Sequence, residues 1–450
     1  MNEFAAEKQI SDSGERTLGS KASQSDILTI YPAPVKHFTS ALLNNWSKID
    51  TDESKSISNE EINQAIIDPT VKGDLALAVA AIEQIPIISW LAADERAGIA
   101  LEDIQALNRL SSKASIELPA VTIIQDKQRI FDANADGDIT KSEFDYAREH
   151  YVSGQAASVL NDLNFASLAG KDGKLTDEEL VRAVPVRTDV LRRVNLAVTE
   201  SSLRLSNSSA NLFGKEAQSL PSADDIKQGS AEDCYLLAGL ASLAAQDPQK
   251  LKEMFVEKDD KTVEVKFAEL KGKAISVNEP TDTEIALYAD TAKGKWPLYA
   301  ELAFGKLRAE TRKSGKVAPG QNIDRGHGFE AGRLLTGLRT FDSQFSKQNN
   351  EEVQSRMDFS LDHKLPIILS TNFPPTDSGL RTRHAYAILG KNQETGKYKI
   401  MDPYRNMTIP QRDLADGKQD GIFEMSIDEM RKNFVMFTSY DQDQVKSGQI

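Results

Sequence analysis

One twelve-residue segment, DANADGDITKSE at 132–143, constrains the fold of this 450-residue chain more than any other feature. Oxygen donors fall at its positions one, three, five, seven and twelve, and Gly137 at position six permits a sharp bend. Ile139 supplies an apolar side chain at position eight. The spacing predicts a loop that wraps a cation between two helices. The expected ligands are Asp132, Asn134, Asp136, Asp138 through its carbonyl, and Glu143.

This pattern is that of an EF-hand calcium loop, and the helix, acidic loop, helix unit recurs four times within 31–190. The first copy, DTDESKSISNEE, keeps the same register, but Lys55 stands where glycine is expected. We therefore predict Ca²⁺ binding here too, although weaker. The expected ligands are Asp50, Asp52, Ser54, Ser56 and Glu61.

The remaining two copies are degenerate. AADERAGIALED begins at Ala92 and LAGKDGKLTDEE begins at Leu168, and neither has an oxygen side chain at position one. We expect neither to bind calcium. The loop starts at 50, 92, 132 and 168 are 42, 40 and 36 residues apart, which favours two pairs of EF-hands, each with one competent loop.

The net charge and the hydropathy of the chain limit the kinds of partner that it is expected to bind. The formal net charge of -14 argues against a nucleic-acid or anionic-membrane surface, because both need clustered Lys and Arg. The longest apolar run, 75–82, is too short to span a bilayer, so no integral membrane contact is expected. The polar residues 1–30 predict a flexible tail without a signal peptide, and a single cysteine excludes an intramolecular disulfide framework. We expect a cytoplasmic protein, with export by another route left open.

A change of pattern marks a second domain. A helical stretch after Val184 gives way to LSNSSANLFG, so we place a linker at 191–214. Beyond it the strand-like runs TVEVKF, LPIILS and YKIMD alternate with helical runs such as LLAGLASLAA. These runs predict a mixed α and β domain over 215–440 and a short tail over 441–450.

The single cysteine, Cys234, directly precedes an apolar helical run. At a helix N-terminus, backbone N–H groups stabilise the nucleophilic thiolate. A cysteine beside leucines is more often an inert core residue, so this interpretation needs a matching base.

His384 is the best candidate base, because RHAYAILG leads into an apolar, strand-like run. Asp402 follows eighteen residues later at the end of another such run and can orient the imidazole. The other histidines fall in less suitable settings: His37 and His150 in EF-hand helices, His363 in a charged segment and His327 in a predicted turn.

Five segments in this order resemble the calpain family of cysteine proteases. QGSAEDCYLLA resembles the calpain cysteine motif, RHAYAILG the histidine segment, and DPY stands in the place of Asn-Pro-Trp. KWPLYAELAFGKL and FEAGRLLTGL resemble two calpain helices between them, and the resemblance covers about 212–435. It implies a two-lobed papain-like protease domain, with Gln228 as an oxyanion donor. The whole chain would then be α+β, an all-α EF-hand module followed by this domain.

Several positions depart from the calpain pattern. Glu232 replaces a glycine and adds a negative charge near the nucleophile, Tyr235 replaces tryptophan, and Asp402 replaces asparagine. Asn406 is a less suitable substitute for Asp402. Familiar calpains also carry their EF-hands after the protease core, whereas here the repeats come first.

The residues favour a calcium-dependent cysteine endopeptidase acting on protein substrates through Cys234, His384 and Asp402. One alternative is a catalytically silent calpain-like protein that binds calcium and partners. Two others are a calcium sensor with a passive second domain, and an enzyme that transfers acyl groups to amines.

Overall fold

The computed structural model describes most of the chain from residue 33 onward. The described residues are 33–84, 99–105, 107–108, 120–121, 123–125, 128–152, 160–161, 163–169, 172–176, 179–180, 188–214, 219–312, 318–375, 378–405, 418 and 420–448. The predicted tail at 1–30 lies outside them. The described residues divide into two compact units, which lie within 1–40 with 104–196 and within 41–103 with 197–450.

The unit that contains the third and fourth repeats is built on a small helical core. Its elements are α8 (Gln128–Phe131), β3 (Asp138–Thr140), α9 (Lys141–His150), α11 (Phe165–Leu168) and β4 (Lys174–Thr176). β3 and β4 pair antiparallel, with Ile139 opposite Leu175. These two position-eight residues belong to a buried cluster with Phe131, Phe144 and Phe165. The apolar residues at position eight of the third and fourth loops thus pair in the short β3–β4 ladder, which joins the two loops.

The first repeat and the start of the second belong to the larger unit. Its elements there are α4 (Trp46–Ile49), β1 (Ser56–Ile57), α5 (Asn59–Ile67), α6 (Asp74–Gln84) and β2 (Ile99–Ala100), while α3 (Ala33–Asn44) and α13 (Thr188–Ser206) span the boundary between the units. β1 pairs with β2, with Ile57 opposite Ile99. The module predicted over 31–190 is therefore divided between two compact units.

A six-stranded antiparallel sheet forms the centre of the larger unit. Its strands are β8 (Thr340–Gln344), β9 (Ile367–Ser370), β10 (Ala385–Lys391), β11 (Tyr398–Met401), β12 (Ile422–Met425) and β13 (Met436–Tyr440), in the order β12-β11-β10-β9-β13-β8. The predicted strand runs LPIILS and YKIMD correspond to β9 and β11.

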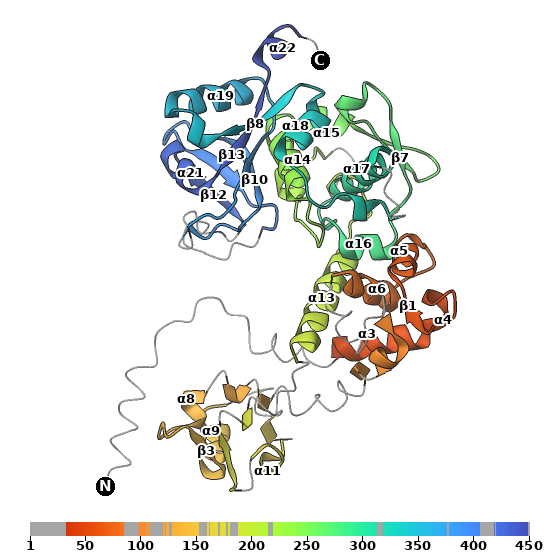
Figure 1. The fold of residues 1–450 in the computed structure, drawn as a ribbon, viewed down its shortest axis with the longest axis vertical. Helices are drawn as coiled ribbons and strands as arrows, with labels where there is room; N and C mark the ends of the chain where they lie inside the picture. The colour runs from red at the N-terminus through yellow and green to blue at the C-terminus, as the bar shows by residue number, and fades with distance from the viewer. Residues whose placement is uncertain are drawn as a thin grey trace. The chain divides into compact units, whose positions relative to one another are not determined.

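Helices cover both faces of this sheet (Figure 1). One face carries α14 (Cys234–Gln246) and α18 (Gly328–Thr336), and the other carries α19 (Asn350–Asp362) and α21 (Ile427–Asn433). Because side chains alternate along a strand, β9 sends Ile368 toward α14, while Ile367 and Leu369 join the cluster with α19 and α21. The apolar run of β9 therefore fits a strand buried on both faces.

The rest of the larger unit is mostly helical. It contains a three-stranded sheet of β5 (Phe255–Glu257), β6 (Val263–Val265) and β7 (Ile275–Val277), with helices η2 (Ala223–Asp225), α15 (Pro248–Glu253), η3 (Ala268–Leu270), α16 (Asp282–Leu287), α17 (Trp296–Arg312), η4 (Pro319–Asn322), η5 (Phe345–Lys347) and α22 (Gln442–Lys446). α22 lies within the predicted C-terminal tail. No helix among the described residues has the length and apolar character needed to cross a membrane. Mixed helix and antiparallel sheet place this domain in the predicted α+β class.

Candidate active site

Cys234 is the first residue of α14, the helix that packs most extensively on β10. This packing brings the thiol to the start of β10, where the Ala385 N–H points at its sulfur. A cleft of about 1010 Å³ opens above it. Its lining includes Gln228, Cys234, His384 and Tyr404, which come from separate parts of the chain. The fold thus gathers the predicted nucleophile, base and oxyanion donor around one cavity.

The environment of Cys234 favours the thiol. Burial raises the pKa of Cys234 to about 12, and the negative charge of Asp233 adds to the rise, while the Ala385 N–H opposes it. The expected lowering by the helix N-terminus is therefore outweighed by desolvation. A proton acceptor must take the thiol proton for the sulfur to act as a nucleophile.

His384 and Asp402 form a buried pair at the ends of two adjacent strands. His384 immediately precedes β10 and Asp402 immediately follows β11, so strand pairing brings them together. Nε2 of His384 lies 2.9 Å from Oδ1 of Asp402. Because Nε2 is engaged, Nδ1 is the ring nitrogen left for chemistry in the cleft.

Other contacts fix both members of the pair. The Thr371 hydroxyl accepts a hydrogen bond from the His384 N–H at 3.0 Å, and Tyr404 stacks on the imidazole at 5.2 Å. Asp402 accepts a further hydrogen bond from the Tyr404 N–H at 2.9 Å and contacts Arg381 Nε at 3.3 Å. The imidazole is thereby held in one orientation.

Gln228 lies in the loop before α14 and is buried. Its main-chain N–H donates to Pro403 O at 2.8 Å, and its side-chain Nε2 donates to Ala231 O at 2.6 Å. The second Nε2 hydrogen remains for a ligand in the cleft. This geometry suits a preorganised donor beside the nucleophile.

Glu232 is paired with Arg325 and does not approach the thiol as an isolated charge. Its carboxylate accepts from Arg325 Nε at 2.9 Å, and its main-chain N–H donates to Asp324 at 2.9 Å. Both side chains are largely exposed on the cleft wall. The glycine replacement therefore adds an ion pair to the rim of the cleft.

Arg308 organises that wall and was missed by the sequence interpretation. Its guanidinium is buried and donates to the carbonyls of Asn322, Ile323, Asp324 and Arg325, and to Glu330 at 2.7 Å. It also lies over the ring of Tyr235. A lone arginine within a helix gives no sign in sequence that it holds a distant loop.

A second missed feature is a pair of buried carboxyls beneath the nucleophile. Asp233 and Glu301 are fully buried and interact electrostatically, and Glu301 accepts a hydrogen bond from the Ala289 N–H at 2.9 Å. Burial raises the pKa of both groups, and their proximity keeps a proton on Glu301. The only signal in sequence was a glutamate inside an apolar helical run.

Three carboxylates converge in the 50–61 loop. Asp50, Asp52 and Glu61 each place an oxygen within 4.8 Å of the others, the one such group within the described residues. Oxygen ligands at this spacing suit Ca²⁺, and Ser54 and Ser56 lie in the same loop to complete the set. Both Glu61 oxygens accept main-chain hydrogen bonds, from Thr51 and Asp52 on one side and Ser58 on the other.

The 132–143 loop follows the same backbone path. Positions four and six have positive φ in both loops: Glu53 at 58° and Lys55 at 65°, against Ala135 at 57° and Gly137 at 90°. Lys55 thus adopts the conformation for which glycine was expected.

The oxygens of the 132–143 loop bind its own backbone. Asp132 accepts from the Gly137 N–H at 3.1 Å, Asp136 from the Asp138 N–H at 2.9 Å, and Glu143 caps α9 with Thr140. The side-chain oxygen Oδ1 of Asn134 accepts a hydrogen bond from the Asp136 N–H at 2.9 Å.

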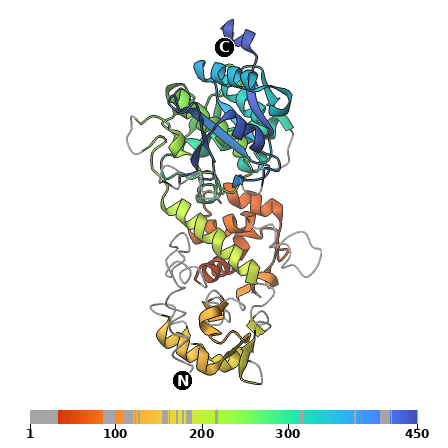
Figure 2. The ribbon, with the colours of Figure 1, turned by 90° about the vertical axis from the view of Figure 1, so that its left-hand side faces the viewer.

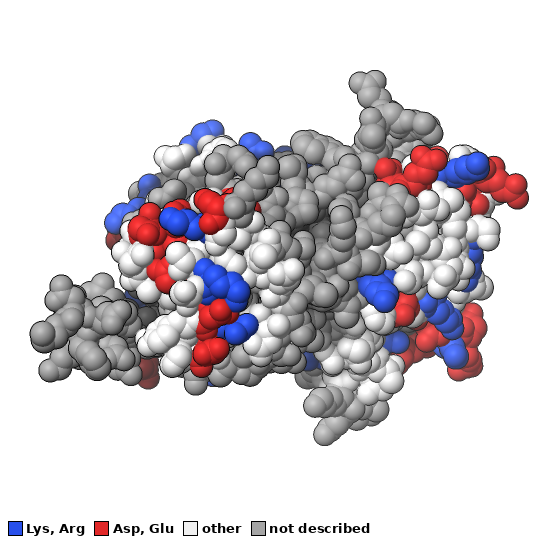
Figure 3. Space-filling view, turned by 90° about the horizontal axis from the view of Figure 1, so that it is seen from below, with Lys and Arg blue, Asp and Glu red and all other residues white. Residues whose placement is uncertain are grey.

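Other predicted features fall outside the site or the described residues. His327 lies in the same cleft, exposed at the start of α18. His150 and His363 each donate a hydrogen bond from Nδ1 to the main-chain carbonyl four residues earlier, Tyr146 O and Phe359 O. Much of the second loop, parts of the fourth and Asn406 lie outside the described residues. On the face in Figure 3, described acidic and basic side chains lie in mixed groups.

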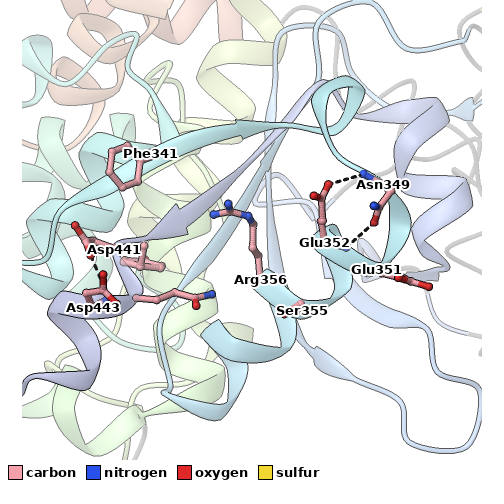
Figure 4. Close-up of a pocket in the computed structure, with 10 residues that line it drawn as sticks. Phe341, Asn349, Glu351, Glu352, Ser355, Arg356, Asp441 and Asp443 are labelled. Carbon is pink, nitrogen blue, oxygen red and sulfur yellow. Dashed lines mark hydrogen bonds between the residues drawn. The ribbon is translucent and has the colours of Figure 1, made fainter.

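A second pocket, of about 660 Å³, lies beside β8 and the start of α19 (Figure 4). Two of its four acidic residues serve as helix caps: Glu352 with Asn349 for α19, and Asp441 for α22. We assign it no chemistry.

Part of the chain that holds these residues is similar to a known family of proteases. Residues 208–406 match the family model for calpain family cysteine proteases, and this range includes Gln228, Cys234, His384 and Asp402. The match supports a calpain-family cysteine protease domain, as the sequence motifs predicted. The repeats before residue 208 lie outside it.

A more particular relative is a protein described as a thiol protease from Porphyromonas gingivalis (strain ATCC BAA-308 / W83). It is 24% identical over 266 residues, which cover 47% of this chain and 53% of the relative. The alignment thus spans about half the length of each protein.

Proposed function

We propose that this protein is a cysteine endopeptidase that hydrolyses peptide bonds of protein substrates. The observation that carries the proposal is the buried His384–Asp402 pair, whose His384 lines the same cleft as Cys234 and Gln228. The match to calpain family cysteine proteases supports the same reaction class.

The chemistry follows from the arrangement. His384 takes the thiol proton, and the Cys234 sulfur attacks the peptide carbonyl to form a tetrahedral oxyanion. The Cys234 N–H and Gln228 Nε2 donate hydrogen bonds to this oxyanion, and each such donor contributes about 10²–10³-fold in rate. His384 then protonates the leaving amine, and water hydrolyses the thioester. Asp402 fixes the imidazole orientation throughout.

We further propose calcium at the 50–61 and 132–143 loops as the regulator. The oxygen donors, the matching positive φ values and the ladders that join paired loops support this assignment as EF-hands. Bound Ca²⁺ would supply positive charge to carboxylates that now accept hydrogen bonds from their own loop.

Cleavage of an unfolded protein substrate tests the proposal. The wild type should release peptides, and Cys234→Ala should release none while its circular dichroism spectrum stays unchanged. Cleavage by Cys234→Ala at the wild-type rate would refute the assignment. Equal rates in calcium and in chelator would remove calcium regulation. Product masses distinguish hydrolysis from transfer to an added amine.

The second candidate function is a catalytically silent protein that binds calcium and partners. The raised pKa of Cys234 favours it, because a thiol that stays protonated does not attack. A wild type that binds calcium, yet neither cleaves unfolded substrates nor reacts with a peptidyl epoxide, would support this alternative.

A further inference from the structure

α16 is one element through which the first repeat contacts the protease domain. The Thr281 hydroxyl, at the N-cap of α16, donates to Ile66 O at 2.6 Å, and Asp282 accepts from the Gly73 N–H at 3.0 Å. Ile66 lies in the last turn of α5, and Gly73 immediately precedes α6. Figure 1 shows α5 and α6 beside α16, and Figure 2 shows the red-orange helices of this repeat from the side.

The other end of α16 holds the loop that carries Gln228. Leu287, the last residue of α16, accepts at its carbonyl from both the N–H and the hydroxyl of Ser230, at 2.8 and 2.6 Å. Three residues on, the Asp290 N–H donates to Lys227 O at 2.9 Å. The segments 287–290 and 227–230 are therefore joined by hydrogen bonds on both sides of Gln228.

These two segments are also in tight steric contact. A Cβ on Gly229 would lie 2.2 Å from the carbonyl oxygen of Tyr288, so no side chain fits between them. Between the same anchors, the Ala289 N–H donates to Glu301, the partner of Asp233 beneath the nucleophile. A shift of 287–290 must therefore displace both the Gln228 loop and the carboxyl pair.

On the side of the 50–61 loop, the chain of contacts that leads to the active site begins at Glu61. Glu61 is the expected twelfth ligand of the 50–61 loop and also the capping-box residue of α5. Its two oxygens accept hydrogen bonds from main-chain groups of the loop and from Ser58. A cation held with Asp50 and Asp52 would compete for those oxygens and would change the direction of the start of α5. The helix carries that change to Ile66, where Thr281 is bound.

We propose that α5 and α16 couple the 50–61 loop to the active site, so that occupancy of the loop sets the position of the Gln228 loop beside Cys234. Thr281 and Asp282 are positioning residues in this coupling. The inference rests on the proposed function for the meaning of the active site, but the coupling itself is measurable without proteolysis.

The reactivity of the single cysteine, Cys234, reports on the coupling. The rate of Cys234 alkylation by iodoacetamide, a neutral reagent, is measured on the full chain in calcium and in chelator. Coupling free energies between sites typically correspond to about 5–150-fold, and we expect a ratio of rates within this range. Calorimetry in an Asp132→Ala/Asp136→Ala background isolates calcium binding at the first loop.

Thr281→Val/Asp282→Ala should bring the alkylation ratio to about one while calcium still binds at the first loop. Thr281→Ser, which keeps the hydroxyl, should retain the wild-type ratio. Asp428→Ala is the matched control, because Asp428 is also a first-turn acid that accepts one hydrogen bond from another helix, at 2.6 Å from Asn350.

A wild-type alkylation ratio of one overturns the coupling, whether or not the protein cleaves substrates. A wild-type ratio retained by Thr281→Val/Asp282→Ala overturns the route through α16. If the ratios follow the prediction but no peptide is released, the coupling stands and the proposed protease function fails.

Discussion

Nε2 of His384 lies 2.9 Å from Oδ1 of Asp402, and both side chains are buried beneath Tyr404 and Arg381. The contact joins two residues whose strands are paired but whose sequence positions are eighteen apart. It makes the orientation of the imidazole depend on one carboxylate that also accepts from the Tyr404 N–H.

Substitution of Asp402 tests that dependence. Asp402→Ala removes the acceptor for His384 Nε2, and we expect kcat/KM to fall by about 10²–10⁴-fold. Asp402→Asn keeps a carbonyl oxygen that accepts from both His384 and the Tyr404 N–H, so it should lose far less. Steady-state kinetics on a peptide substrate compare the two, and equal losses would show that the charge, not the orientation, matters.

The Asp233–Glu301 pair predicts a specific dependence of stability on pH. The pKa of Glu301 is raised in the folded protein because the side chain is buried beside Asp233. The bound proton therefore stabilises the fold fully below the unfolded pKa of about 4.3, and that stabilisation is lost as the pH rises toward the folded pKa.

Glu301→Gln mimics the protonated form, because its amide can donate to Asp233 and its carbonyl can accept from the Ala289 N–H. We expect this variant to exceed the wild type in free energy of unfolding at pH 9 by at least about 1 kcal/mol, with a smaller difference at pH 5. Urea denaturation measures both. Glu310→Gln, an exposed position on the same helix, is the control; parallel curves for all three proteins would contradict the shared buried proton.

Arg308 should be a stabilising residue because its guanidinium satisfies four buried or part-buried carbonyls and pairs with Glu330. We expect Arg308→Ala to lower the free energy of unfolding by about 3 kcal/mol or more. Arg333→Ala breaks a partly exposed pair with Glu269, and should cost about 0–1 kcal/mol. Similar losses in the two variants would show that the 322–325 loop does not depend on Arg308.

Lys55 has a φ of 65°, a conformation that favours glycine. Lys55→Gly should therefore stabilise the fold by about 1 kcal/mol and tighten calcium binding at the first loop. Lys261→Gly relieves a similar φ of 66° at a site remote from the loops and should leave calcium affinity unchanged. Calorimetry measures the calcium affinity of both variants. Weaker calcium binding by Lys55→Gly than by the wild type would contradict the strain argument.

The local sequence pattern predicted the helices and strands of this molecule better than it predicted the contacts between distant segments. The runs LPIILS and YKIMD become β9 and β11, and LLAGLASLAA lies within α14, because apolar periodicity reports burial directly. The five ordered motifs predicted the protease domain for a different reason, since three of them carry residues that the chemistry needs.

Contacts between residues far apart in the chain could not be predicted from the sequence pattern. Nothing in the sequence shows that Arg308 reaches the 322–325 loop, that Glu232 pairs with Arg325, or that α16 contacts α5. Each depends on side chains that meet only after the chain has folded. The burial that raises the pKa of Cys234 was likewise not readable from its place at a helix N-terminus.

The most direct test of the account is active-site labelling with a peptidyl epoxide, followed by intact mass measurement and peptide mapping. We predict one adduct per chain on Cys234 in the wild type, and strongly reduced labelling in His384→Ala and in urea-unfolded protein. Iodoacetamide labelling of Cys234 without any epoxide adduct would show an accessible thiol that is not organised as a nucleophile, and would contradict the protease assignment.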